Sequence, residues 1–317
     1  MTALPDPIDI ARAAENIRPH VHRTPLLRTD HFGCGRLLLK AENLQRGGSF
    51  KIRGALNAVL RAREEGRIGS AGVITYSSGN HGQAVALAAR IVGCASTIVV
   101  PEDIARVKLR AIEDLGAAVV LRGTTSEDRL AGAEEIARKT GAHIIPPYEH
   151  PDVIAGQGTV GLEILEEAPE TDLVVVPVGG GGLISGIAIG IKSRSPRTHV
   201  VGVEPAGADD TARSLREGKR VRIDPPRTIA DGLRALTPGE LTFEAIRRHV
   251  DDVWVVADES TSAAQRRLLS GAKLLVEPSG AVGLAAVLDR QTELEEKQVV
   301  VILSGGNTDT LPGLAGP

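Results

Sequence analysis

Aromatic residues and cysteines are scarce in this 317-residue chain, and no apolar run is long enough to span a bilayer. Phe, Trp and Tyr together make up 2% of the sequence. The two cysteines, Cys34 and Cys94, stand alone without CxxC or metal-ligand spacing. They exclude a disulfide framework and are typical of reduced cytosolic thiols. The net charge of −3 gives no reason to expect binding to nucleic acid or to an anionic membrane.

A targeting segment is also missing from the start of the chain. Residues 1–7 lack a basic region followed by an apolar run, so we expect a cytoplasmic protein. Hydrophobic residues make up 42% and charged residues 24% of the sequence, which is ordinary for a soluble globular protein. The length allows two lobes that share a cleft.

What the sequence does contain is a regular alternation of short apolar runs and amphipathic segments. From residue 72 to 149 this pattern predicts four strands near 73–76, 96–100, 118–121 and 143–145, separated by helices. Strands near 173–178, 200–203, 253–256 and 298–303 predict a second unit of the same kind. Such alternation favours an α/β fold with two open, mostly parallel lobes. We expect residues 1–71 and 150–317 to form a large domain and residues 72–149 a small one.

Lys51 is conspicuous because arginine carries most of the positive charge of the chain. It follows two glycines, Ser49 and Phe50, and it precedes a predicted helix over 52–65. A lysine at such a place is suited to be a buried amine, whose desolvation frees the lone pair that a Schiff base requires. An equally good alternative to a buried amine is a lysine whose aliphatic carbons pack against the protein while its amine stays in water.

A second signal is a run of four glycines, 179–182, between a predicted strand and a predicted helix. Consecutive backbone N–H groups there could converge on one anion, helped by the helix dipole, so Gly179, Gly180, Gly181 and Gly182 predict a phosphate site. No Gly-Lys-Ser/Thr follows, which argues against a nucleoside triphosphate. The GxGxxG spacing is also imperfect, which weakens a dinucleotide hypothesis. Close packing of a helix on a strand would require only one of these glycines.

Two more polar loops follow predicted strands. Residues 77–82 are rich in small hydrogen-bond donors at a helix start and suit a carboxylate, although a simple helix N-cap would also use one of them. Residues 304–307 follow the last predicted strand, where ligands collect in open α/β sheets. A lysine, a phosphate site, a carboxylate loop and a hydroxyl are together the parts needed to hold pyridoxal phosphate. Its aldehyde would bind Lys51, its phosphate the glycines, and its ring nitrogen Ser304.

The four blocks resemble the serine/threonine dehydratase and serine racemase family of fold-type II pyridoxal-phosphate enzymes, whose fold is that of the tryptophan synthase β subunit. They are Asn43–Ala55, Ser77–Gln83, Gly179–Gly182 and Ser304–Asn307. The resemblance spans nearly the whole chain. It implies a cofactor bound in the cleft between the lobes, and a homodimer.

The same resemblance implies roles for individual residues. Lys51 would form the Schiff base and act as the base on one face of the substrate, and Ser78 would face the opposite side. The implied cofactor contacts are Phe50, Lys51, Asn80, Gly179, Gly180, Gly181, Gly182 and Ser304. The implied substrate contacts are Ser77, Ser78, Gly79, Asn80 and His81, although His81 taken alone is more typical of a structural residue. Because the chain ends at Pro317, we expect no isoleucine-binding regulatory domain.

The resemblance further implies a divalent cation site for Mg²⁺, Ca²⁺ or Mn²⁺. Its ligands would be Glu204, the Ala208 carbonyl and Asp210, an oxygen set that suits these ions. On spacing alone, this acidic cluster would be a solvated helix start.

The leading hypothesis is a lyase that converts a β-hydroxy-α-amino acid, such as L-threonine or L-serine, to a 2-oxo acid and ammonia. A serine or aspartate-type racemase, and a dehydratase of a less common substrate such as 3-hydroxyaspartate, are the alternatives within the family. From other classes, a non-catalytic phosphate-ligand sensor and a dinucleotide-dependent oxidoreductase are weaker alternatives. Arg129 could meet a second substrate carboxylate, but an arginine on a solvated helix is favoured.

Overall fold

The computed structural model describes residues 3–33 and 35–308, and it arranges the strands of those residues in two separate sheets. All but one of the strand pairings are parallel. The prediction of two open, mostly parallel sheets is therefore confirmed. Cys34 lies outside the described residues.

The larger sheet has six strands in the order β1-β2-β10-β7-β8-β9. These are β1 (Leu26–Arg28), β2 (Arg36–Lys40), β7 (Leu173–Pro177), β8 (His199–Pro205), β9 (Asp252–Val256) and β10 (Gln298–Ile302). Only the edge strand β1 runs antiparallel to its neighbour. The smaller sheet is fully parallel, with the order β5-β4-β3-β6. Its strands are β3 (Val73–Thr75), β4 (Ser96–Val100), β5 (Ala118–Leu121) and β6 (His143–Ile144).

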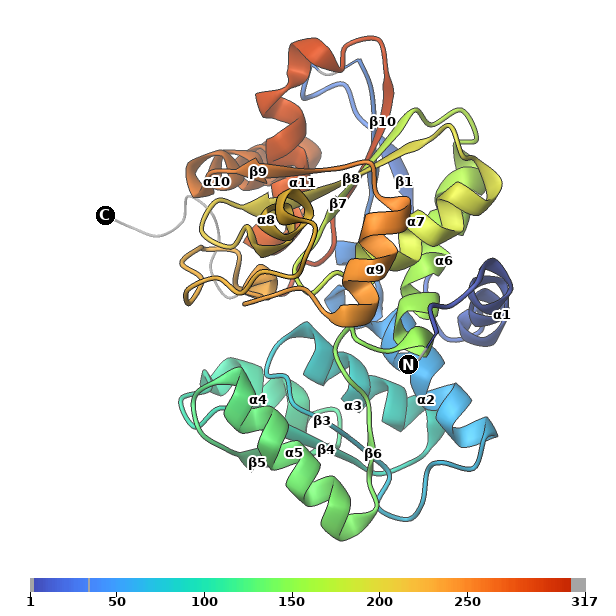
Figure 1. Cartoon of the computed structure of the whole chain (residues 1–317), viewed down its shortest axis with the longest axis vertical. Helices are drawn as coiled ribbons and strands as arrows, with labels where there is room; N and C mark the ends of the chain where they lie inside the picture. Colours follow the sequence, from blue (N-terminus) through green and yellow to red (C-terminus); the bar gives the residue numbers. More distant parts are fainter. Residues whose placement is uncertain (1–2, 34, 309–317) are drawn as a thin grey trace.

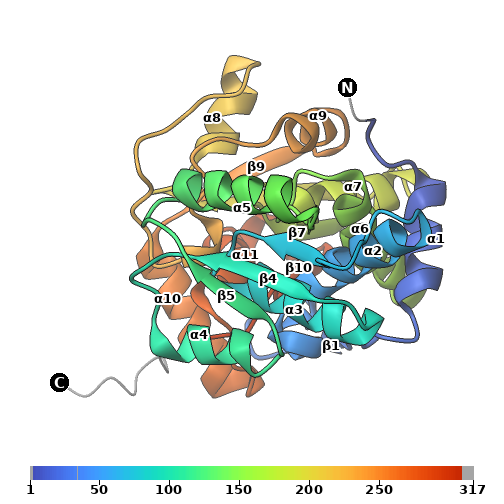
Figure 2. The same cartoon turned by 90° about the horizontal axis from the view of Figure 1, so that it is seen from below.

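Helices surround both sheets (Figures 1 and 2). They are α1 (Pro7–Ile17), α2 (Lys51–Glu64), α3 (Asn80–Val92), α4 (Arg106–Glu113), α5 (Ser126–Thr140), α6 (Pro151–Glu167), α7 (Gly182–Arg194), α8 (Asp210–Glu217), α9 (Glu240–His249), α10 (Asp258–Arg267) and α11 (Pro278–Asp289). Local sequence explains several of their ends. Thr125 and Asp128 form a capping box at the start of α5, and Gly141 ends that helix in the left-handed conformation.

Successive residues of a strand point to opposite faces of the larger sheet, and both faces are buried. Val174 and Val176 pack with α6 and α7 residues such as Ile187. Their neighbour Val175 points to the other face and packs with α11 residues such as Ala285. All five residues of β7 are buried, as is typical of a parallel strand covered by helices on both sides. β7 itself therefore has no side chain that could bind a ligand, and any such group must lie in the turn that follows the strand.

The two sheets occupy different parts of the molecule (Figure 1). The smaller sheet with α3, α4 and α5 forms the lower part in that view, and α2 packs against both α3 and α6 at the boundary. Every strand of the smaller sheet falls within residues 72–149. This distribution supports the predicted division at residues 71/72 and 149/150, which itself stays a prediction. No helix among the described residues is long and apolar enough to cross a membrane.

Candidate active site

Lys51 is the first residue of α2, and its amine is drawn into the protein. Nζ donates a hydrogen bond to the Pro147 carbonyl at 3.0 Å and lies 5.1 Å from the centre of the Phe50 ring. Burial lowers the pKa of this amine to about 8, with Glu277 acting in the opposite direction. A substantial fraction of the amine is thus neutral near physiological pH, as a nucleophilic lysine requires.

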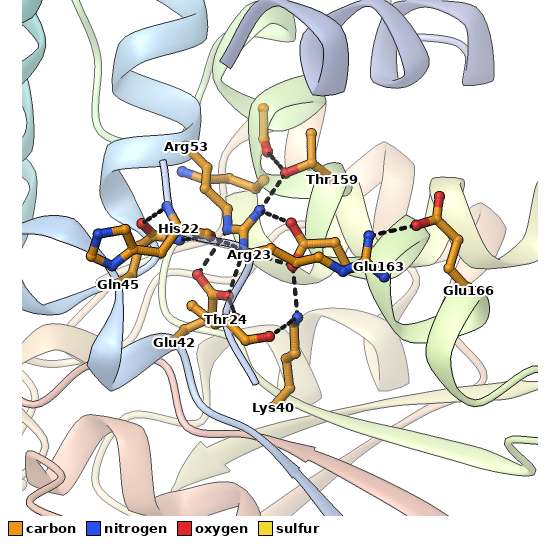
Figure 3. Close-up of polar contacts among 12 residues, drawn as sticks. His22, Arg23, Thr24, Lys40, Glu42, Gln45, Arg53, Thr159, Glu163 and Glu166 are labelled. Carbon is orange, nitrogen blue, oxygen red and sulfur yellow. Dashed lines mark hydrogen bonds and ion pairs between the residues drawn. The ribbon is translucent and has the colours of Figure 1, made fainter. Parts of the chain in front are cut away.

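A buried ionic cluster behind Lys51 fixes the first turn of α2 (Figure 3). Arg53 donates two hydrogen bonds of 2.8 Å to Glu42, which follows β2, and two of 2.7 and 2.9 Å to Glu163 of α6. Lys40 donates to the same Glu163 at 2.6 Å. Burial alone would lower the pKa of Arg53, but the charges of Glu42 and Glu163 outweigh it and raise the pKa above its ordinary value. The charged cluster therefore ties the helix that carries Lys51 to β2 and α6.

Ser304 lies directly beside the lysine block. Its carbonyl accepts the Phe50 N–H at 3.1 Å, and the next residue, Gly305, forms an antiparallel bridge with Ser49. The Ser304 side chain is buried, with 3% of the residue exposed. The structure thus brings together two blocks that are separated by 250 positions in the sequence.

The four glycines form the turn between β7 and α7, and two of them, Gly179 (φ 55°) and Gly181 (φ 88°), are left-handed. Because α7 begins at Gly182, the amides of its first turn have no partner within the helix and are suited to bind an anion. A Cβ at Gly180 would lie 2.3 Å from the Tyr148 ring. From the sequence we expected close packing to require only one of these glycines. That expectation was wrong, because the Tyr148 ring leaves no room for a side chain at Gly180 and Tyr148 also lies close to Gly182.

The loop 77–82 joins β3 to α3, and none of its side chains caps the helix. Gly79 occupies the N-cap position and no side chain caps the helix, while Ser77, Ser78, Gly79 and Asn80 are partly exposed. The simple N-cap explanation thus does not account for these side chains. The open amides of the first turn of α3 suit a carboxylate.

His81 is buried and uncharged. Its Nε2 contacts the Ile145 carbonyl at 3.0 Å, and since a carbonyl only accepts, Nε2 carries the proton. Burial, and then the charge of Lys51, lower its pKa to about 3. Its Nδ1 is buried without a partner. His81 can therefore accept one hydrogen bond but cannot offer a positive charge to a substrate carboxylate.

Three residues that the sequence did not assign complete the geometry. Tyr148 packs on Gly180 and Gly182 next to the Pro147 carbonyl, which connects the glycine turn to Lys51. Glu277 accepts a hydrogen bond of 2.8 Å from Asn80, and Asn307 donates one of 2.8 Å to the same amide. Nothing in the sequence near Glu277 shows that this residue would face Asn80.

The comparison with protein families identifies this arrangement. The family described as "Pyridoxal-phosphate dependent enzyme" matches residues 17–305. The chain belongs to this family of pyridoxal-phosphate-dependent enzymes. The suspected resemblance is thereby confirmed.

Individual relatives are similar over almost all of the enzyme. L-threo-3-hydroxyaspartate ammonia-lyase of Saccharomyces cerevisiae is 43% identical over 95% of this chain and 93% of its own length. L-threonine ammonia-lyase of Thermotoga maritima is 44% identical over 95% of this chain and 75% of its own. The structure of maize serine racemase superposes with a TM-score of 0.92 at 40% identity, covering 96% of this chain and 94% of that one. The predicted fold-type II architecture is confirmed.

The residues present fit pyridoxal phosphate. A partly neutral lysine, a glycine turn with open helix amides, and the buried Ser304 adjoin one another through the contacts of Phe50, Pro147 and Tyr148. Buried polar atoms without partners, such as His81 Nδ1, also lie in this region. Such atoms are costly in a site that stays empty and are expected in one that takes a polar ligand.

The residues predicted to bind a cation are buried at the junction of β8 and α8. Both Glu204 oxygens accept backbone N–H groups, from Thr211 at 3.1 Å and from Ala212 at 2.9 Å, which makes Glu204 a cap of α8. Both Asp210 carboxylate oxygens are buried without partners, and Ala208 is fully buried. The described residues contain no group of three or more His, Cys, Asp and Glu side chains that could hold a metal ion. The expected set, two carboxylates and a carbonyl, stays a prediction.

Proposed function

We propose that the enzyme is an ammonia-lyase that converts a β-hydroxy-α-amino acid, such as L-threonine or L-serine, to a 2-oxo acid and ammonia. The α-proton and the β-hydroxyl leave as water, and a second water hydrolyses the resulting enamine to the 2-oxo acid and ammonia. The observation that carries this proposal is the Lys51 amine, which donates to the Pro147 carbonyl and whose pKa burial lowers to about 8. The similarity to two ammonia-lyases over 95% of the chain supports it.

Lys51 has two roles in this proposal. Its Nζ would hold the cofactor covalently, and as a neutral amine it is suited to remove the α-proton of the substrate. The bound cofactor supplies an aldehyde for the substrate amine and a ring that stabilises negative charge on the α-carbon. Because Pro147 and the Arg53 cluster constrain Lys51 from two sides, little reorganisation is required of it.

The remaining cofactor contacts follow from the positions of the other blocks. Gly179, Gly180, Gly181 and Gly182 would hold the phosphate, Phe50 would pack on the ring, Asn80 would bind the ring hydroxyl, and Ser304 would contact the ring nitrogen. The neutral Ser304 hydroxyl would not keep that nitrogen protonated. The ring would then withdraw less negative charge from the substrate, which favours β-elimination over transamination.

The substrate carboxylate binds the loop 77–82. Ser77, Ser78, Gly79 and Asn80 contribute hydroxyl, amide and backbone donors at the start of α3, and His81 contributes its backbone N–H, because its Nδ1 can only accept. Since His81 is neutral, carboxylate binding depends on these dipoles and on the helix terminus.

The test of the proposed function is the release of 2-oxo acid from a panel of L-threonine, L-serine and L-threo-3-hydroxyaspartate, measured with purified protein and pyridoxal phosphate. Release from L-threonine or L-serine supports the proposal. The third substrate is included because Nε of the half-buried Arg129 is buried without a partner and could meet a second carboxylate. D-amino acid formation without 2-oxo acid from any member would reject the lyase in favour of a racemase.

Racemisation is the second candidate because Ser78 lies in the substrate loop with a partly exposed side chain. The similarity of fold to maize serine racemase also favours it. If Ser78 is the acid on the face opposite Lys51, racemisation needs its proton and elimination from the L-isomer does not.

We therefore expect Ser78→Ala to separate the two reactions. Racemisation should fall by about 10²–10⁴, the range for a positioned acid–base group, whereas 2-oxo acid release should fall much less. Chiral chromatography and a coupled 2-oxo acid assay on one sample measure both, with Ser77→Ala as the neighbouring control. Equal loss of both reactions would instead assign Ser78 to carboxylate binding.

We further propose that Glu204, the Ala208 carbonyl and Asp210 bind Mg²⁺, Ca²⁺ or Mn²⁺ as a structural or activating ion. The two unpartnered, buried oxygens of Asp210 support this, because a buried carboxylate requires a compensating charge or proton. Nothing in this cluster belongs to the contacts that surround Lys51.

An ion at this site should raise the melting temperature. A ligand that binds only the folded state stabilises it by roughly 2.7 kcal/mol at a hundredfold excess over its dissociation constant. Chelation should lower the activity without releasing the cofactor, and Asp210→Ala should abolish the response. Asp209→Asn is the control, since Asp209 pairs with Arg213 at 2.8 Å. Melting curves that respond neither to chelator nor to metal would leave these residues as a buried helix start.

A homodimeric state and a cytoplasmic location complete the proposal. The dimer follows from the family resemblance, and the location from the two isolated cysteines, which are typical of a reducing compartment. Light scattering of the purified protein and fractionation of cells would test them.

A further inference from the structure

A chain of hydrogen bonds with a fixed direction passes through Asn80. The Gly47 carbonyl accepts from Asn307 Nδ2 at 2.7 Å, and the same nitrogen donates to Asn80 Oδ1 at 2.8 Å. Asn80 Nδ2 then donates to Glu277 Oε1 at 2.8 Å. Because a backbone carbonyl can only accept, Gly47 sets the orientation of both amides. The nitrogen of Asn80 must face Glu277.

Glu277 is held firmly at the end of this series of hydrogen bonds. It is the N-cap residue of α11, its backbone N–H donates to the Gly305 carbonyl at 3.0 Å, and only 5% of the residue is exposed. A Cβ on Gly305 would lie 2.6 Å from Oε1, so the residue after Ser304 has to be small to admit the carboxylate. The Asn80–Glu277 bond joins α3 of the lower part of Figure 1 to α11 of the upper part.

The carboxylate also lies within the electrostatic influence of the lysine. Burial and then Asp231 raise the pKa of Glu277 to about 8, while the hydrogen bond from Asn80 and the charges of Lys108 and Lys51 lower it. Glu277 acts on the pKa of Lys51 in the opposite direction to burial. Glu277 thus belongs to the same site as Lys51, although it makes no direct bond to the amine in the structure.

We infer that Glu277 is a positioning residue that orients the Asn80 amide toward the cofactor ring. An amide nitrogen has two hydrogens, and Glu277 takes one of those on Asn80. The second remains for the ring hydroxyl of the cofactor. With Asn307 on its oxygen and Glu277 on its nitrogen, the amide cannot rotate to present its oxygen instead. This inference rests on the proposed function, because it requires the cofactor to bind beside Asn80.

A double-mutant cycle on cofactor affinity tests the inference. The dissociation constant of pyridoxal phosphate is measured by equilibrium dialysis of cofactor-depleted protein for the wild type, Glu277→Met, Asn80→Ala and the double variant. We expect Glu277→Met to weaken binding about tenfold, as the loss of one hydrogen bond would. In the Asn80→Ala background, the same substitution should have almost no further effect. Glu277→Ala provides a second cycle in case Glu277→Met does not fold.

Glu277→Gln keeps an acceptor for the Asn80 hydrogen bond but removes the ionisable carboxyl group. Its amide oxygen can still accept from Asn80, so we expect cofactor affinity and the absorption maximum of the holoprotein to stay near those of the wild type. Asp231→Asn is the matched control, since it removes a nearby charge that does not touch Asn80. Additive losses in the double variant, or a Glu277→Gln variant as weak as Glu277→Met, would overturn the inference. Absence of a borohydride-reduced cofactor on Lys51 of the wild type would instead refute the proposed function.

Discussion

Replacing Lys51 with alanine is expected to lower kcat for 2-oxo acid release by at least about 10⁴-fold, because it removes both the covalent attachment of the cofactor and the base. A positioned base alone contributes roughly 10²–10⁴. The glycine turn remains in place, so weak, non-covalent cofactor binding should persist. Lys139→Ala is a suitable control, since the side chain of Lys139 is 71% exposed and pairs with Glu135 on the same helix.

Borohydride reduction provides a direct readout of the same residue. The holoprotein should be yellow, reduction should bleach the band, and peptide mapping should find the adduct on Lys51. Since only the neutral amine attacks the aldehyde, the rate of cofactor capture by depleted protein should rise with pH and level off above about pH 8. An adduct on a different lysine, or none at all, would remove the basis of the proposed function.

The second large effect is expected on stability. Replacing Arg53 with methionine should lower the free energy of unfolding by about 3–5 kcal/mol, because Glu42 and Glu163 lose their guanidinium partner while remaining mostly buried. Figure 3 shows that Lys40 still reaches Glu163, whereas Glu42 keeps no cationic partner among the residues drawn. Urea unfolding of the holoprotein measures the loss.

The cluster should also make stability depend on pH. Although burial raises the pKa of Glu163, the charges and hydrogen bonds of Arg53 and Lys40 together outweigh it, so the folded pKa is below the ordinary value. Its contribution is therefore present at neutral pH and is lost as the pH falls through that lowered pKa.

Arg23 supplies the control for this prediction. It bonds Glu166 at 2.7 Å and Glu167 at 3.0 Å, but its side chain is 52% exposed. Arg23→Met should cost less than about 1 kcal/mol, as exposed ion pairs do. If Arg53→Met were as mild as Arg23→Met, the buried cluster would not fix the start of α2.

The sequence by itself determined the parts of this protein that depend on local pattern. Apolar runs of three to six residues between amphipathic segments predicted the parallel strands, since period and turn residues are local properties. The blocks around Lys51, Gly179–Gly182 and Ser304 were recognisable because their chemistry needs particular residues at short spacing. These features do not require knowledge of what lies across the molecule.

Only the tertiary structure decided how these parts meet. The Pro147 carbonyl, the Tyr148 ring and Glu277 reach the site from distant positions, and nothing near them in the sequence marks them as its neighbours. The neutral state of His81, the lowered pKa of Lys51 and the packing demands on Gly180 follow from burial, which is a property of the folded molecule. Residue type sets which chemistry is possible, whereas desolvation and long-range contacts set which protonation state and orientation each group adopts.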